Sequence, residues 1–143
     1  LVVDDSALIS LAHWVTPENE PRRFDARFFV AALPSGQRTY DVDGEADRTA
    51  WLRPEDALDA WHGGNLDMWI PTASTMRLLT EGSTAAEVVE NARHRSVVPV
   101  RPHEVPAADG TLAWHLVHDR TLEVLEPMDP KDMASETAVV RRT

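Results

Sequence analysis

The first part of the chain alternates between apolar and polar positions in a way that predicts two paired β-strands. Residues 7–15 (ALISLAHWV) are apolar and rich in strand formers, and residues 22–33 form a second run with period two. In this second run, the apolar face comprises Phe24, Ala26, Phe28 and Val30, and the other face comprises Arg23, Asp25, Arg27 and Phe29. Two prolines bracket the polar residues of the segment 16–21, which predicts a turn and therefore an antiparallel hairpin.

The middle of the chain changes to a helical pattern. Its apolar spacing predicts helices over residues 54–62, 71–79 and 85–93. Pro54 suits the first turn of the first helix, and Gly63 ends that helix. Thr84 and Glu87 have the spacing of a capping box, which places the start of the third helix directly after Thr84.

Short apolar runs predict four further strands, over residues 49–53, 97–100, 111–118 and 122–125. A polar tail follows from Pro127. Predicted strands precede and follow a block of three predicted helices, and there is no internal repeat, so the predicted fold class is α+β. The predicted organisation is one domain over residues 1–126 and a polar C-terminal tail over residues 127–143.

The amino-acid composition excludes several classes of function for this protein. The length of 143 residues suits a single domain with a substantial core. The absence of cysteine excludes disulfides, thiolate catalysis and zinc–thiolate sites. The net charge is −10 without a basic cluster, which argues against a nucleic-acid partner. No apolar run approaches the roughly 18 residues of a membrane helix, and no signal peptide is evident, so we expect a cytoplasmic protein without a membrane partner.

Acidic residues concentrate in one predicted loop. The carboxylates are those of Asp41, Asp43, Glu45 and Asp47. Carboxylate oxygens are the ligands that hard divalent cations prefer. The loop is not an EF-hand, because Ala46 stands where that motif needs glycine and Leu52 where it needs glutamate. The alternative is an acidic loop in contact with solvent, and composition alone favours this alternative.

The second predicted strand carries the candidate anion-binding residues. Arg22, Arg23 and Arg27 accompany Asp25, and arginine forms the preferred hydrogen-bonding fork for phosphate. A substrate phosphate contact and cross-strand ion pairs on a solvent-exposed sheet face are equally consistent with this pattern. Most of the tryptophans are expected to pack in the core, but Trp69 is also a candidate for lining a pocket.

A family resemblance rests on the hairpin. Residues 13–17 (HWVTP) and 22–30 (RRFDARFFV) resemble the second half of a Nudix hydrolase, within the branch of the peroxisomal coenzyme A diphosphatases and their bacterial relatives. That branch has W-x-T-P followed by R-R-F-D-T-x-F-F, and Ala26 replaces its threonine. Looser similarities lie in residues 44–58, in Trp69–Thr72 and in Ala138–Arg142, and the resemblance covers most of residues 11–80.

The Nudix signature G-x5-E-x7-R-E-U-x-E-E-x-G, with U a bulky aliphatic residue, is absent. The chain contains neither an Arg-Glu nor a Glu-Glu dipeptide. In this branch the signature precedes the W-T-P segment and supplies the glutamate ligands for magnesium. We therefore expect the chain to be the C-terminal portion of a Nudix protein, with a mixed sheet and flanking helices that are incomplete at the N-terminus.

The resemblance implies metal-dependent hydrolysis of a diphosphate linked to another moiety, in a coenzyme A-like or nucleotide-like substrate. The metal would be Mg²⁺ or Mn²⁺, with Glu45 as ligand or general base. The implied roles of the other residues are metal binding for Asp43 and Asp47, and substrate binding for Arg22, Arg23, Asp25 and Trp69. A non-catalytic nucleotide- or protein-binding module and an inactive fragment are the alternatives. The expected partners are the small-molecule substrate and either a second copy or a companion N-terminal segment.

Overall fold

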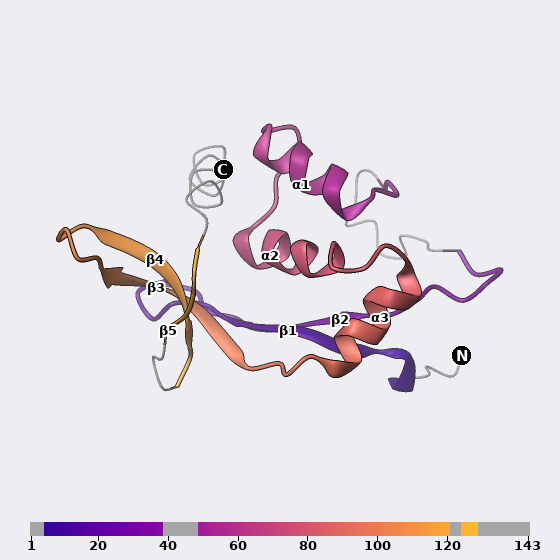
Figure 1. Cartoon of the computed structure of the whole chain (residues 1–143), viewed down its shortest axis with the longest axis horizontal. Helices are drawn as coiled ribbons and strands as arrows, with labels where there is room; N and C mark the ends of the chain where they lie inside the picture. Colours follow the sequence, from indigo (N-terminus) through magenta and orange to yellow (C-terminus); the bar gives the residue numbers. More distant parts are fainter. Residues whose placement is uncertain (1–4, 39–48, 121–123, 129–143) are drawn as a thin grey trace.

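The strands of the chain form one mixed sheet (Figure 1). The computed structural model describes residues 5–38, 49–120 and 124–128. These residues contain a short 3-10 helix, η1 (Asp5–Ala7), strands β1 (Ile9–Val15), β2 (Asp25–Val30), β3 (Pro99–Pro106), β4 (Leu112–His118) and β5 (Val124–Pro127), and helices α1 (Pro54–His62), α2 (Ile70–Leu79) and α3 (Ala85–His94). The strand order is β2-β1-β3-β4-β5. Strands β1 and β3 are parallel and the other neighbours are antiparallel, so the α+β class is confirmed.

The predicted N-terminal hairpin is confirmed in β1 and β2. Burial alternates along β2, with Asp25, Arg27 and Phe29 exposed and the residues between them half-buried. The strand is shorter than predicted, because it begins at Asp25 and leaves Arg22 and Arg23 in the preceding loop. The pairing register of β1 shifts between Ser10 and Ala12, which is a β-bulge.

Two strand predictions need correction. Residues 49–53 form no strand, and Trp51 in this segment is 76% exposed. The residue before a proline is restricted to extended conformations, so Arg53 before Pro54 is extended without a neighbouring strand. Strand β3 extends to Pro106, well beyond the predicted end at Val100, because it pairs with β4 over seven residue pairs.

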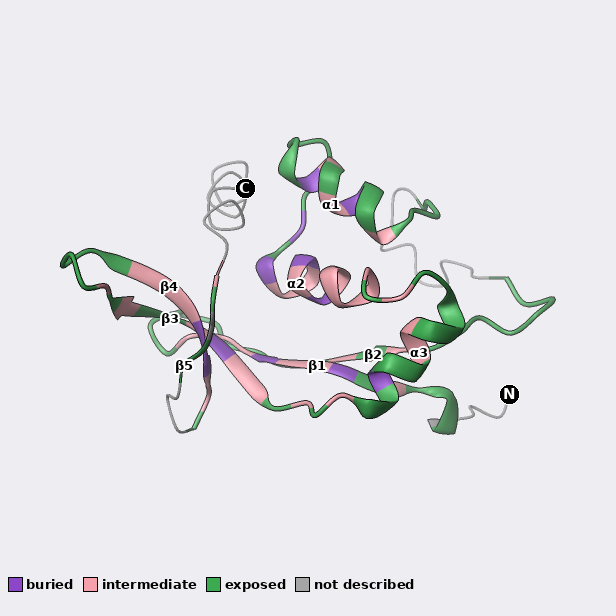
Figure 2. Ribbon diagram, in the orientation of Figure 1, coloured by how far each residue is buried: buried purple, intermediate pink, exposed green. Residues whose placement is uncertain are grey.

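Helices α1 and α2 lie on one side of the sheet, and α3 packs against β1 (Figure 1). Helix α2 lies between the sheet and α1, and two apolar clusters hold these layers together. The inner cluster is formed by Trp14 from β1, Ile70 from α2 and Leu116 from β4. The outer cluster is formed by Trp61, Met68 and Ala73, between α1 and α2. Figure 2 shows buried positions on the facing sides of α1 and α2 and exposed positions on the outer side of α1.

The helix ends follow the predicted signals. Helix α1 has proline in its first turn, and its C-cap is Gly63. The Thr84 hydroxyl accepts a hydrogen bond from the Glu87 backbone N–H at 3.2 Å, while the Glu87 carboxylate accepts one from the Ser83 N–H at 2.8 Å. Gly82 allows the segment before α3 to pass close to that helix, because a Cβ there would lie 2.8 Å from the backbone nitrogen of Val88.

The turn between β3 and β4 is organised by one carboxylate. Asp109 accepts hydrogen bonds from the Thr111 hydroxyl at 2.7 Å and from the Thr111 backbone N–H at 3.0 Å. These bonds, that of the hydroxyl above all, lower the pKa of Asp109 below its ordinary value. Gly110 has a φ of +84°, which glycine adopts without strain.

The side of the sheet opposite the helices carries exposed side chains from β2. Within the described part of the chain, no helix covers Asp25, Arg27 and Phe29, and Phe29 is 53% exposed. None of the described helices is long and apolar enough to cross a membrane.

Candidate functional site

The loop between β1 and β2 carries the candidate arginines, and Thr16 closes it. The Thr16 backbone N–H donates to the Phe24 carbonyl at 3.0 Å, and the Phe24 N–H donates to the Thr16 hydroxyl at 2.9 Å. Arg23 Nε donates to the Thr16 carbonyl at 3.0 Å. The Arg23 side chain is therefore engaged in holding the loop, which assigns it a positioning role.

Arg22 is held differently. Its guanidinium carbon lies 5.1 Å from the centroid of the Phe24 ring, in a cation–π contact. The ring is 56% exposed, so this contact holds the guanidinium at the protein surface. A guanidinium stacked on a ring keeps its in-plane N–H donors directed sideways, where an oxyanion can meet them. Of the two arginines that the sequence left equal, Arg22 has the geometry better suited to phosphate.

Asp25 pairs across the hairpin with His13, which the sequence analysis did not select. His13 Nε2 lies 2.6 Å from Asp25 Oδ1, and the His13 side chain is 17% exposed. The two residues occupy adjacent strands on the face away from the helices. The cross-strand pairing expected as the alternative to substrate binding is thus present for Asp25, and one carboxylate oxygen is engaged by it.

A buried arginine anchors the same loop to the sheet. The Arg101 side chain is 7% exposed, and its Nη1 lies 3.1 Å from Glu18 Oε1. Its Nε lies 3.9 Å from Asp119 Oδ1 and has no hydrogen-bond partner. Sequence reasoning missed Arg101. The only local signal was a basic residue between the apolar strand positions Val100 and Pro102.

Replacing Glu18 with glutamine is expected to destabilise the fold by about 1–2 kcal/mol, because it leaves the buried Arg101 charge without its hydrogen-bonded carboxylate. Urea denaturation measures the loss. Arg101→Met removes the charge together with its pairing requirement and should cost less than Glu18→Gln. Glu20→Gln, in the same turn, is the matched control and should stay within about 0.5 kcal/mol. Equal losses for Glu18→Gln and Glu20→Gln would contradict the anchoring role of Arg101.

The remaining predicted site residues are not gathered at the hairpin loop. Trp69 is 54% exposed and stands at the N-cap of α2, where its carbonyl accepts from the Ala73 N–H at 3.0 Å. Among the described residues, no hydrogen bond, ion pair or ring contact joins Trp69 to the loop. Asp43, Glu45 and Asp47 lie outside the described residues. The described residues contain no group of three histidine or carboxylate side chains placed to hold a metal.

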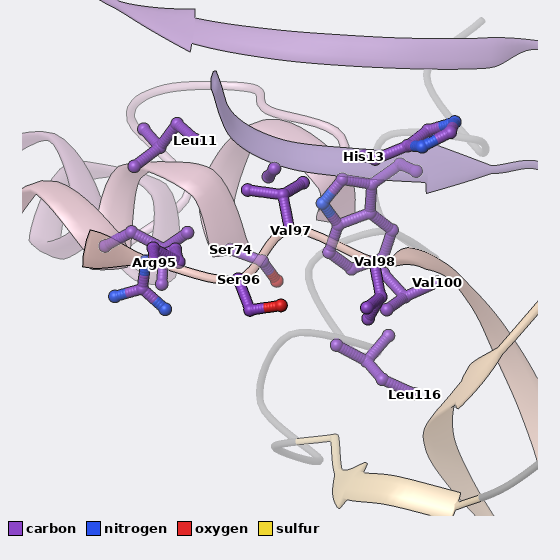
Figure 3. A pocket seen from close by; sticks show the side chains of 12 residues that line it. Leu11, His13, Ser74, Arg95, Ser96, Val97, Val98, Val100 and Leu116 are labelled. Atoms are coloured by element: carbon purple, nitrogen blue, oxygen red, sulfur yellow. The ribbon is translucent and has the colours of Figure 1, made fainter. Parts of the chain in front are cut away.

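A cavity of about 150 Å³ lies between β1, α2 and the segment that joins α3 to β3 (Figure 3). Its lining is mainly apolar, with Ser74 and Ser96 as hydroxyl groups. Four consecutive residues of β1, Leu11 to Trp14, line it, next to the register shift between Ser10 and Ala12. None of the predicted site residues lines this cavity.

Comparisons with known proteins give no relative from which a function could be transferred. No family model, no curated protein and no solved structure matches the chain.

Proposed function

We propose that this chain is part of a Nudix-type hydrolase that cleaves a diphosphate linked to another moiety, in a coenzyme A-like or nucleotide-like substrate. The observation that carries the proposal is the hairpin loop. The segments that resemble the family form this loop, and their arginines divide into an anchored Arg23 and a surface-held Arg22. Such a division suits a site that must present one guanidinium to a phosphate in a fixed place.

In this proposal Arg22 binds a diphosphate oxygen, and Arg23 fixes the loop through the Thr16 carbonyl. Asp25, already oriented by His13, accepts a hydrogen bond from the substrate through its second oxygen. Trp69 is exposed enough to stack on a ring of the substrate.

In this proposal, the acidic segment 41–47 adds further ligands to the metal site. Asp43, Glu45 and Asp47 supply carboxylate oxygens, and this donor set fits Mg²⁺ or Mn²⁺. Bound there, the cation would neutralise phosphate charge and lower the pKa of water. Glu45 is the residue that we assign as metal ligand or general base.

A companion N-terminal segment would supply the main metal ligands in this proposal. The family signature lies on a loop–helix–loop, and the face of the sheet away from the described helices offers an apolar side chain, Phe29, together with the charges of Asp25 and Arg27. We place the complete enzyme in the cytoplasm.

Replacing Arg22 with glutamine is expected to weaken binding of coenzyme A about tenfold, because a charge-assisted hydrogen bond to phosphate is lost. Isothermal titration of the 143-residue chain with coenzyme A measures the affinity. Arg93→Gln, on the exposed surface of α3, is the control and should bind like the unchanged chain. Equal affinity of the Arg22 variant and the unchanged chain would remove Arg22 from the site. Binding without hydrolysis after the companion segment is supplied would favour the non-catalytic binding module.

A further inference from the structure

Strand β2 forms one edge of the sheet, and its hydrogen-bonding pattern identifies the groups at this edge. The Phe24 carbonyl and N–H point toward Thr16 at the end of β1. Successive residues of a strand point their backbone groups to opposite sides, so Ala26 and Phe28 also point to β1. The N–H and C=O groups of Asp25, Arg27 and Phe29 therefore point to the outer edge. Within the described part of the chain, no strand pairs with them.

Two features that usually block strand addition are missing from this edge, while its charged side chains, Asp25 and Arg27, restrict which partner can pair with it. Strand β2 contains neither proline nor lysine, and its pairing with β1 shifts only through an extra residue in β1. Phe29 is 53% exposed beside the free groups. A regular edge strand with an exposed aromatic ring is a template for another strand.

The charges along the edge select the partner. We propose that a second copy of this chain pairs antiparallel along β2, with the two-fold axis at Ala26. This register places Asp25 of each copy directly opposite Arg27 of the other, so two reciprocal ion pairs form. Both residues expose their backbone groups at the edge, so each pair also exchanges two backbone hydrogen bonds.

Neighbouring registers lack this complementarity. A two-fold axis at Arg27 places two arginines opposite each other, and an axis at Asp25 places two aspartates opposite each other. An axis at Phe28 places Arg27 opposite Phe29 and Asp25 opposite Ala31, so neither charge has a partner. A register that pairs an odd-numbered residue with an even-numbered residue of the second copy would put the inner face of one sheet beside the outer face of the other.

Sedimentation velocity of the 143-residue chain over a concentration series tests the proposal. A single strand pair buries less than the roughly 800 Å² per partner of a standard interface, so we expect a reversible dimer with an affinity near the micromolar range. Arg27→Asp should raise the dissociation constant about tenfold or more, because each copy then meets two like-charge pairs. The double reversal Asp25→Arg with Arg27→Asp restores opposite charges and should recover most of the affinity.

Two further variants separate edge pairing from other causes. Phe29→Pro removes the outward N–H that this register places opposite Arg23 of the second copy, while the ladder to β1 stays intact, so it should weaken the dimer without changing the circular dichroism spectrum. Arg93→Asp changes the same charge on α3 and should leave the dimer unaffected. A chain that stays monomeric at every concentration would overturn the proposal. A dimer that survives Phe29→Pro and Arg27→Asp unchanged, or one to which the double reversal restores nothing, would also overturn it.

Discussion

Replacing Trp14 with alanine is expected to cost about 3–5 kcal/mol of folding free energy. Trp14 is 4% exposed and packs with Ile70 and Leu116, so a single side chain joins β1, α2 and β4. Domains of this size have total stabilities of only about 5–15 kcal/mol. The variant should therefore lose most of its stability and unfold at much lower urea concentrations.

Urea denaturation followed by circular dichroism measures this loss. The chain offers a matched control in Trp51, which is 76% exposed. Trp51→Ala should stay within about 0.5 kcal/mol of the unchanged chain. Similar losses in the two variants would contradict the placement of Trp14 at the centre of the inner cluster.

Local sequence signals predicted much of this fold because they act over a few residues. The capping pair Thr84 and Glu87, the proline at position 54 and the glycine at position 63 each act within one turn of a helix. The alternation along residues 25–30 likewise depends on nothing beyond the strand itself. The helices were therefore predicted close to their observed bounds, whereas the strand predicted over residues 22–33 is shorter in the structure, at Asp25–Val30.

Strand β3 shows where local rules fail. The sequence predicted a strand over residues 97–100 that is interrupted by Pro99, because proline removes a ladder hydrogen bond. The Pro99 carbonyl accepts from the Asp119 N–H, so alternate residues from Pro99 onward point to β4. Pro102 and Pro106 are the intervening positions and point away from β4, where a missing N–H costs no ladder bond. Which residues of β3 point toward β4 and which point away can be known only from the pairing of the two strands.

The sequence predicted the candidate site residues in and next to the hairpin loop, but it did not predict the residues that contact them. Arg22, Arg23 and Asp25 were selected because arginine and carboxylate groups lie close together in sequence. His13 contacts Asp25 from β1, within the hairpin, and Arg101 contacts Glu18 from β3. Arg101 reaches Glu18 only because β3 lies beside β1, which is a long-range arrangement that local spacing does not encode.

Replacing Glu45 with glutamine is expected to lower magnesium-dependent diphosphatase turnover by about 100-fold or more, in the protein that includes its signature segment. The substitution keeps the shape of the side chain and removes the charge needed to bind the metal or to accept a proton. Asp41→Asn is the matched control, since Asp41 lies in the same acidic run and is not assigned a role. Equal losses in both variants would indicate a general charge effect, and no loss in the Glu45 variant would remove Glu45 from the mechanism.

The central proposal is that this chain is part of a Nudix-type diphosphohydrolase whose main metal ligands lie on a companion segment. The most direct measurement is the intact mass and N-terminal sequence of the protein purified from its natural source. We predict additional chain before Leu1, or a co-purifying peptide, that carries the R-E-U-x-E-E pattern. A mature protein that begins at Leu1, with no companion peptide, would contradict the claim.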